Sequence, residues 1–218
     1  MHKLYFTLTI CRACDAIIEE KKSYNISCRG DAPIRWRIRV GSTYANSGGT
    51  VHNTHMIIVN GFFNPRIFEY DIAMIRSATY FTFTTNVRPA SIAGATFNLP
   101  DNSVVWATGW GATIYQGPRS EVLRHTQVWV VNQNACELRY REIGRILSPV
   151  MLCTGWLNVG GRDQCTGDNG SPVVSITSAG HVVVGIRSWG IGCGHARWPG
   201  VSTRISTVAD WIAYYAYP

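Results

Sequence analysis

The residues best suited to chemistry surround one glycine-rich stretch, Gly167-Asp168-Asn169-Gly170-Ser171-Pro172. Asn169 stands at its centre and carries a carboxamide. The lone pair of an amide nitrogen is delocalised into the carbonyl, so even a well-placed general base cannot convert it into an alkoxide equivalent. The stretch therefore offers an amide where a catalytic loop needs a nucleophile, and the nearest hydroxyl belongs to Ser171.

Histidine and cysteine residues do not form a metal-binding pattern in this sequence. Six histidines are spread along the chain, and none belongs to an H-E-x-x-H pair. Cys11-Arg12-Ala13-Cys14 has the spacing of half a zinc site, but no second half follows. We interpret the histidines as ordinary strand and loop residues, since a general base needs a nucleophile within ~3 Å and an orienting partner. We therefore predict no metal and no cofactor.

The composition indicates a loop-rich β protein with a substantial core. The chain has 218 residues, of which 46% are hydrophobic, with 21 glycines and 9 prolines. No apolar run approaches the ~18 residues of a membrane span, so we expect no membrane association. The formal net charge of +7 comes mainly from arginines scattered along predicted strands, without the clustered aromatics of a nucleic-acid site. A nucleic-acid partner is therefore not predicted.

Alternation of apolar and polar residues identifies the strands that must position these groups. In residues 35–40, three arginines alternate with three apolar residues, which predicts a strand with one solvated face. Further strands are predicted at residues 104–108, 128–131 and 181–186, each bounded by Gly, Asn or Pro. Helix is predicted only near the end of the chain, where Thr207 begins a capping-box-like pattern.

Short motifs between Arg35 and Tyr214 match one known family in their order and spacing. They are Val40-Gly41-Ser42-Thr43, Tyr70-Asp71-Ile72-Ala73, Thr108-Gly109-Trp110-Gly111, Leu123-Arg124-His125, Leu152-Cys153, Arg162-Asp163-Gln164-Cys165, Ser188-Trp189-Gly190 and Trp198-Pro199-Gly200-Val201. Together with the stretch around Asn169, this sequence resembles the trypsin-like serine proteases of the chymotrypsin fold, and among them the insect digestive trypsins.

The resemblance implies an all-β fold of two antiparallel six-stranded barrels, with a crossing segment near residues 90–103. The first barrel is expected to be truncated on its N-terminal side. The expected boundaries are residues 1–13 for a segment outside the family, 14–218 for the peptidase domain, about 14–100 and 104–206 for the two barrels, and about 207–216 for a C-terminal helix.

The resemblance also assigns the catalytic positions. Asp71 matches the aspartate that orients the catalytic histidine, whereas Ser27 stands at the histidine position and Asn169 at the position of the nucleophilic serine. The backbone N–H groups of Gly167 and Asn169 match the oxyanion donors. Without a histidine, we expect Asp71 to bond to Ser27 or to water. Asp168 matches the residue that receives the amino terminus created by activation cleavage; without such a terminus, we expect an unpaired carboxylate and a zymogen-like, partly disordered loop.

The specificity residues of the family are retained in this sequence. Asp163 lies six positions before Asn169, at the position of the carboxylate that receives an arginine or lysine side chain. Gly190 and Gly200 match the small residues that keep such a pocket open. Ser188 and Trp189, with Gly190, match the strand that pairs with substrate backbone. The implied partner is a peptide or protein with an exposed arginine or lysine, or a protease inhibitor, bound by a monomer.

Seven cysteines indicate disulfides and a secreted protein. The resemblance implies the pairs Cys136–Cys153 and Cys165–Cys193, and a pair between Cys28 and either Cys14 or Cys11, which leaves one cysteine over. Residues 1–10 have a basic start and an apolar stretch, but they are short and polar for a signal sequence. The alternative is a leftover family strand, in which case a cytosolic product would keep its cysteines reduced.

Three functions remain open from the sequence. The first is a non-catalytic protease homologue that binds through its retained pocket or surface. The second is an active endopeptidase cleaving after Arg or Lys, which requires that Asn169 and the N-terminal stretch are sequence errors or that Ser171 serves as nucleophile. The third is a decayed, unstable product. Loss of a nucleophile or base costs about 10⁶-fold in turnover, so about one turnover per day would remain, which favours the first.

Overall fold

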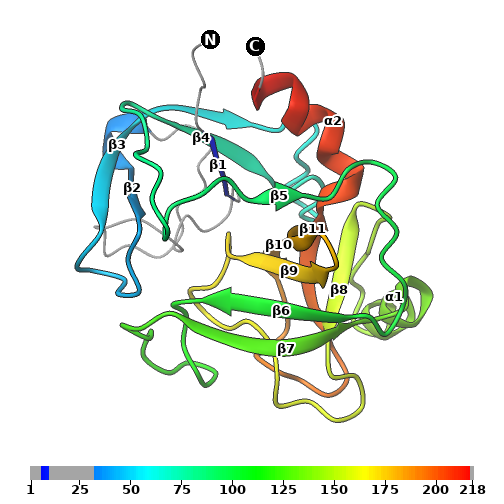
Figure 1. Ribbon diagram of the computed structural model, residues 1–218. Coiled ribbons are helices and arrows are strands. Elements are labelled where there is room, and N and C mark those ends of the chain that lie inside the picture. The colour runs from blue at the N-terminus through cyan, green and yellow to red at the C-terminus, as the bar shows by residue number, and fades with distance from the viewer. Residues whose placement is uncertain (1–5, 10–31, 217–218) are drawn as a thin grey trace.

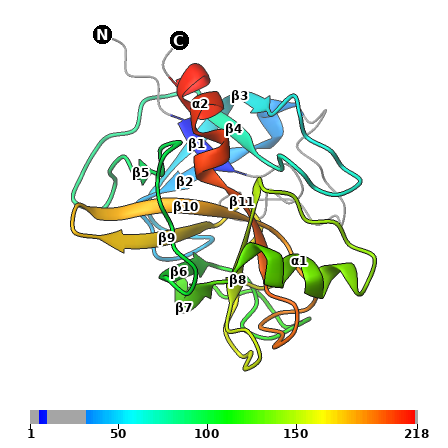
Figure 2. The same ribbon diagram turned by 90° about the vertical axis from the view of Figure 1, so that its right-hand side faces the viewer.

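The computed structural model describes residues 6–9 and 32–216 of the chain, which form two β-sheet regions side by side (Figures 1 and 2). The first region is a four-stranded antiparallel sheet in the order β1-β4-β3-β2. Its strands are β1 (Phe6–Thr9), β2 (Arg37–Val40), β3 (Thr50–Val59) and β4 (Ala73–Ser77). Within the described residues, this half is an open four-stranded sheet, where we predicted a first barrel truncated on its N-terminal side.

The second region is a closed six-stranded antiparallel barrel, as predicted. Its strand order is β11-β8-β7-β6-β9-β10, and pairing of β10 with β11 closes it. The strands are β6 (Val104–Gly109), β7 (Arg124–Val130), β8 (Met151–Gly155), β9 (Pro172–Thr177), β10 (Gly180–Trp189) and β11 (Gly200–Arg204). The short strand β5 (Ser91–Ile92), within the predicted crossing segment, adds to β10 in parallel.

Strand β1 lies in the stretch that we predicted to be outside the family domain. All four of its residues pair with β4, from Phe6 opposite Arg76 to Thr9 opposite Ala73. This pairing makes residues 6–9 an edge strand of the first sheet.

The alternating pattern of residues 35–40 folds largely as predicted. Trp36 and Ile38 are buried while Arg37 is exposed, so one face of β2 meets the core and the other faces solvent. The strand begins later than predicted, at Arg37. Pro33 starts a turn of 3₁₀ helix over Pro33–Arg35, and its fixed φ suits this helical turn better than a strand.

Two helices cover the barrel, of which only one was predicted. Helix α1 (Gln133–Arg141) was missed by the prediction that helix occurs only near the C-terminus. Its N-cap is Asn132, whose side-chain oxygen accepts a hydrogen bond from the N–H of Ala135 at 3.0 Å. Helix α2 (Ile205–Ala216) begins two residues before the predicted start. The hydroxyl of Thr207 donates to the carbonyl of Arg204 at 2.7 Å, so Thr207 lies within the first turn and is not the N-cap.

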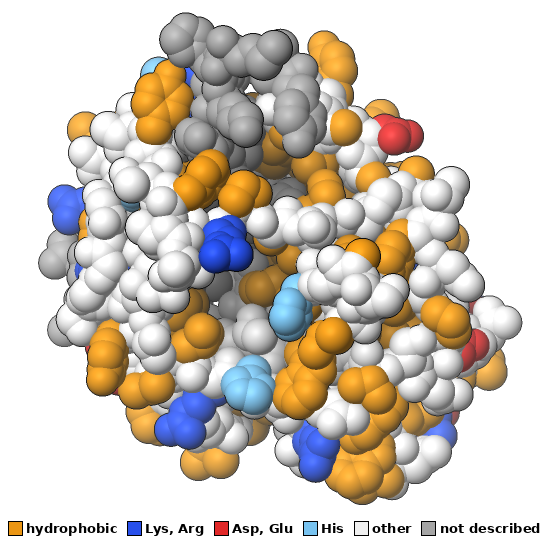
Figure 3. Space-filling model, in the orientation of Figure 1, with side chains coloured by type: hydrophobic (Ala, Val, Ile, Leu, Met, Phe, Trp, Pro, Cys, Tyr) orange, Lys and Arg blue, Asp and Glu red, His pale blue; other side chains and the backbone are white. Residues whose placement is uncertain are grey.

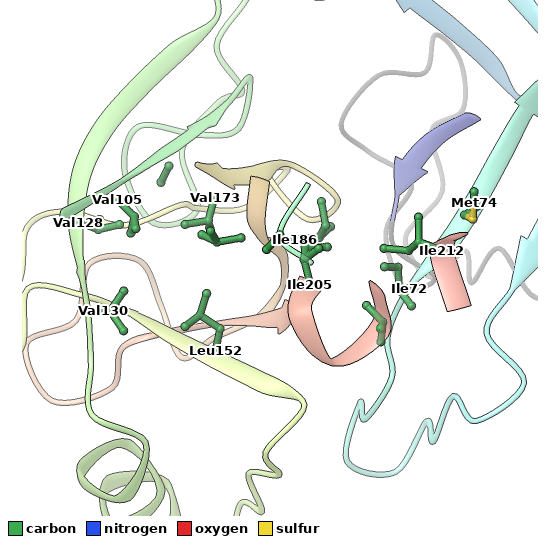
Figure 4. Packing of buried hydrophobic residues seen from close by; sticks show 14 residues of the cluster. Ile72, Met74, Val105, Val128, Val130, Leu152, Val173, Ile186, Ile205 and Ile212 are labelled. Carbon is green, nitrogen blue, oxygen red and sulfur yellow. The ribbon is translucent and has the colours of Figure 1, made fainter. Parts of the chain in front are cut away.

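One hydrophobic cluster joins the barrel to the first sheet through α2 (Figure 4). Ile205 of α2 packs at the barrel end of this cluster, and Ile212 of the same helix lies beside Ile72 and Met74. The remaining buried members line the barrel interior; among them are Val105, Val128, Val130, Leu152, Val173, Val184 and Ile186.

Two of the predicted disulfides are confirmed. Cys136 of α1 bonds to Cys153 of β8, and Cys165 bonds to Cys193. The predicted partners Cys14 and Cys28 lie outside the described residues, as does Cys11. No helix within the described residues is long and apolar enough to cross a membrane.

Candidate functional site

The C-terminal end of strand β10 organises the candidate site. Arg187, Ser188 and Trp189 are its last three residues, and all three are buried. The N–H of Arg187 donates to the carbonyl of Ser171 at 2.9 Å, and the carbonyl of Arg187 accepts from the N–H of Gly170 at 2.9 Å. These two backbone bonds hold the glycine-rich loop against the strand.

Asp71, the predicted triad aspartate, is fully buried just before strand β4. Its Oδ2 accepts a hydrogen bond from the hydroxyl of Ser188 at 2.6 Å, and its backbone carbonyl accepts one from the hydroxyl of Thr203 at 2.7 Å. We expected Ser27 or water as the partner of this carboxylate; Ser27 lies outside the described residues, and the described partner is Ser188. Ser188 thereby links the position of Asp71 to the strand that holds the glycine-rich loop.

Asp168, which we predicted to be an unpaired buried charge, is held by hydrogen bonds from the backbone. Its Oδ1 accepts from the N–H of Gly111 at 2.7 Å, and its Oδ2 accepts from the N–H of Cys165 at 2.9 Å. A Cβ atom on Gly109 or Gly111 would come within 1.8 or 2.5 Å of this carboxyl group, so the two glycines of the Thr108-Gly109-Trp110-Gly111 motif make room for it. Burial raises the pKa of Asp168, and the two backbone donors oppose that increase.

The turn around Asn169 is held by backbone hydrogen bonds. The N–H of Asp168 donates to the carbonyl of Cys165 at 3.0 Å, and the N–H of Ser171 donates to the carbonyl of Asp168 at 2.9 Å. Gly167 has a φ of +94°, which a residue with a side chain rarely adopts. Within the described residues, the N–H groups of Gly167 and Asn169 find no acceptor. This organisation counts against the partly disordered, zymogen-like loop that we expected.

Ser171 does not present its hydroxyl to solvent. The residue is 2% exposed, and its Oγ lies 3.0 Å from the position that a Cβ on Gly109 would take, on the side where the carboxylate of Asp168 lies. Its side chain is part of the packing beneath the loop.

The described histidines occupy the positions expected for ordinary strand and loop residues. His52 and His55 lie on β3, His125 on β7, His181 on β10 and His195 before β11. Their contacts include a 2.7 Å hydrogen bond between His52 Nδ1 and Thr79 Oγ1, and ring contacts of His52 with Phe81, His125 with Trp106 and His195 with Trp198.

Asp163, the predicted specificity carboxylate, has an unexpected partner. The guanidinium Nη1 of Arg187 lies 3.2 Å from Asp163 Oδ1, and their side chains are 4% and 5% exposed. The carboxylate also accepts from the N–H of Gln164 at 2.8 Å and from the N–H of Gly194 at 3.3 Å. Burial raises the pKa of Asp163, and Arg187 and these backbone donors oppose the increase. A buried ion pair thus occupies the predicted pocket.

Sequence reasoning missed Arg187 although a signal was present. The residue directly follows the predicted strand 181–186, which the structure extends to Trp189, and at this buried position a long charged side chain needs a buried partner. Tyr140, on the helix that was not predicted, also faces this region: its ring packs 4.9 Å from that of Trp189, and its hydroxyl donates to the carbonyl of Pro199.

A small pocket shares Trp189 with the site. Phe68 packs against the indole with a 6.5 Å separation of ring centroids. The lining residues are Arg66, Ile67, Phe68, Gly144, Arg145, Ile146 and Trp189. Over the face that Figure 3 displays, basic side chains lie apart from one another among apolar and uncharged atoms.

Comparison with known proteins identifies the family. The trypsin family matches residues 26–212 of this chain. The chain belongs to the trypsin family. It is 51% identical to Trypsin CFT-1 of Choristoneura fumiferana over 208 residues, which are 94% of this chain and 80% of that protein. It is 50% identical to alkaline trypsin A of Manduca sexta over 207 residues, 94% of this chain and 79% of that one.

A third relative of this trypsin-family chain carries a different name. Achelase-1 of Lonomia achelous is 45% identical over 185 residues, which are 82% of this chain and 87% of that protein. The family assignment agrees with the closed barrel, the second sheet and the C-terminal helix. Within the described part of the chain, no group of three or more His, Cys, Asp or Glu side chains could hold a metal ion.

Proposed function

We propose that this chain is a non-catalytic member of the trypsin family, which binds basic side chains without cleaving the polypeptide that carries them. The observation that carries the proposal is Asn169, at the centre of a turn that backbone hydrogen bonds of Asp168, Gly170 and Ser171 hold in place. The turn has the order that a nucleophile loop needs, and the side chain it presents is a carboxamide.

The neighbouring groups support loss of turnover without loss of fold. Asp71 is held by the hydroxyl of Ser188, and Asp168 by two backbone donors. Ser171 is buried and turned toward Gly109, away from the role of a substitute nucleophile. The assignment of Ser27 to the histidine position remains part of this proposal.

We propose that the pocket around Asp163 retains the binding part of the family's function. Asp163 is buried beside Gly190 and Gly200, and the disulfide Cys165–Cys193 ties together the two segments that carry it and Gly194. We propose an exposed arginine or lysine of a peptide, protein or protease inhibitor as the ligand, and a secreted monomer as the form that binds it, because disulfides persist in oxidising compartments.

The test is hydrolysis of an arginyl peptide amide by the purified protein, alongside its thermal unfolding. We expect a cooperative unfolding transition and turnover no faster than about one event per molecule per day. A serine-reactive phosphonate added to the same sample should leave the intact mass unchanged. Phosphonate labelling at Ser171 together with measurable turnover would establish the active endopeptidase, and absence of a cooperative transition would establish the unstable product.

A further inference from the structure

The pocket of Asp163 already contains an arginine. We propose that Arg187 is a built-in occupant of this pocket, and that a basic side chain from a partner binds only by displacing it. This inference rests on the proposed function, because it concerns how the same pocket is controlled.

The position of the guanidinium group shows what it fills. A Cβ atom on Gly190 would lie 2.6 Å from Nη2 of Arg187, and a Cβ on Gly200 would lie 1.7 Å from Nη1. The same Cβ on Gly200 would lie 2.4 Å from Asp163 Oδ1. The guanidinium therefore lies directly over both glycines that were predicted to keep the pocket open, at the carboxylate that was predicted to receive a ligand.

A second cation does not fit beside Arg187. The two side chains of the pair are almost completely buried, and their charges neutralise each other. An incoming arginine or lysine would meet a neutralised carboxylate and a like charge in a space of low dielectric constant, which disfavours an uncompensated buried ion. Binding of the partner and occupancy by Arg187 are therefore mutually exclusive.

The bonding of Arg187 makes the exchange feasible. A guanidinium carries five N–H donors, and a bidentate pair with a carboxylate is its strongest arrangement. In the described structure Arg187 reaches Asp163 through Nη1 alone at 3.2 Å, and its buried Nε finds no acceptor among the described residues. The carboxylate keeps its backbone bonds from Gln164 and Gly194 whichever cation is present. The exchange therefore requires only that a partner's basic group replace the guanidinium of Arg187.

The experiment measures binding of benzamidine, a mimic of the arginine side chain, by calorimetry and by the shift of the thermal midpoint. The variant is Arg187→Val, which removes the occupant. The matched control is Arg37→Val, the same change at an exposed strand position of the first sheet. We expect Arg187→Val to bind benzamidine at least tenfold more tightly than the wild type and the control, which is about 1.4 kcal/mol.

The outcomes separate the inference from the proposed function. Equal, tight binding of benzamidine by the wild type and by Arg187→Val would contradict the inference that Arg187 fills the pocket. The proposed arginine-binding pocket would remain. Absence of benzamidine binding by a folded Arg187→Val would contradict the proposed arginine-binding pocket, and with it the inference that Arg187 fills that pocket. Because Arg187→Val leaves Asp163 without its cation, Arg187→Gln serves as a second variant whose amide can still donate to the carboxylate.

The accessibility of Arg187 can also be measured on the wild-type protein. Arginines are modified with phenylglyoxal and the sites are read by peptide mass spectrometry. We expect Arg187 to react at least tenfold more slowly than the exposed Arg37, and benzamidine at saturating concentration to accelerate its reaction by expelling it. Reaction of Arg187 at the rate of Arg37 without benzamidine would overturn the inference.

Discussion

Two buried carboxylates of the site are stabilised by different groups. Asp168, in the loop around Asn169, receives the backbone N–H groups of Gly111 and Cys165. Asp163, in the pocket, receives two backbone N–H groups and the side chain of Arg187. Backbone donors are fixed by the fold, whereas a side chain can rotate away. The donors to Asp168 are therefore fixed by the backbone, whereas we propose that the cation beside Asp163 can be exchanged.

Breaking the pocket pair should produce the largest change in stability. We expect Asp163→Ala to lower the free energy of unfolding by about 3–5 kcal/mol, because it leaves the buried Arg187 without a counter-charge. Adding Arg187→Met should recover most of this loss, since an apolar side chain needs no partner. Denaturant unfolding of both single variants and the double variant measures the coupling. If the effects of the two substitutions simply add, Arg187 and Asp163 do not depend on each other as the structure requires.

Removing the carboxylate of Asp168 should lower the free energy of unfolding, and no second side-chain change should restore it. Asp168→Ala leaves the buried N–H groups of Gly111 and Cys165 without an acceptor, which we expect to destabilise the protein by about 2–4 kcal/mol. Asp168→Asn keeps one acceptor oxygen and should lose about half as much. Urea unfolding measures both variants. A loss below about 0.5 kcal/mol for Asp168→Ala would show that the loop carboxylate is not held by the fold.

The buried histidine His52 lies outside the loop and the pocket, and we expect its effect on stability to be smaller than that of either carboxylate. Burial lowers the pKa of His52 on β3, whose Nδ1 contacts Thr79. Because the folded-state pKa lies below the unfolded value of about 6.5, the stability that this residue contributes is present above that value and is lost as the pH falls through the lowered pKa. We expect the thermal midpoint to fall by a few degrees between about pH 7 and pH 5.

His52→Asn, whose amide can still bond to Thr79, provides the control for this dependence. Its thermal midpoint should change less over the same pH range than that of the wild type. An unchanged slope would assign the acid dependence to other groups, including those around the two carboxylates.

The fold was predictable where a short pattern decides it. Alternation placed the strands that became β6, β7 and β10, and the family motifs placed both described disulfides. Helix α1 was missed because a single Asn132 cap, followed by a largely polar helix, gives little hydrophobic periodicity. The start of α2 was misplaced because Thr207 bonds backward to Arg204.

The site was predictable only for residues that belong to a known motif. Asp71, Asp163 and the glycines were proposed as site residues from their neighbours in the sequence. Arg187 lies one residue before the Ser188-Trp189-Gly190 motif, so the match began just after the residue that changes the pocket. Asp168 was expected to be unpaired because only a side-chain or terminal cation was considered, and sequence patterns do not reveal a backbone donor such as that of Gly111.

Helix α2 has a further consequence for the whole molecule. Ile205 and Ile212, on one helix, belong to a single apolar cluster that includes the barrel interior and the start of β4. Melting the whole helix would expose apolar surface of both sheets at once, whereas loss of its last two turns would remove only the contacts of Ile212 with the start of β4. We therefore expect a chain shortened at this end to lose the contact between the two halves before it loses the barrel.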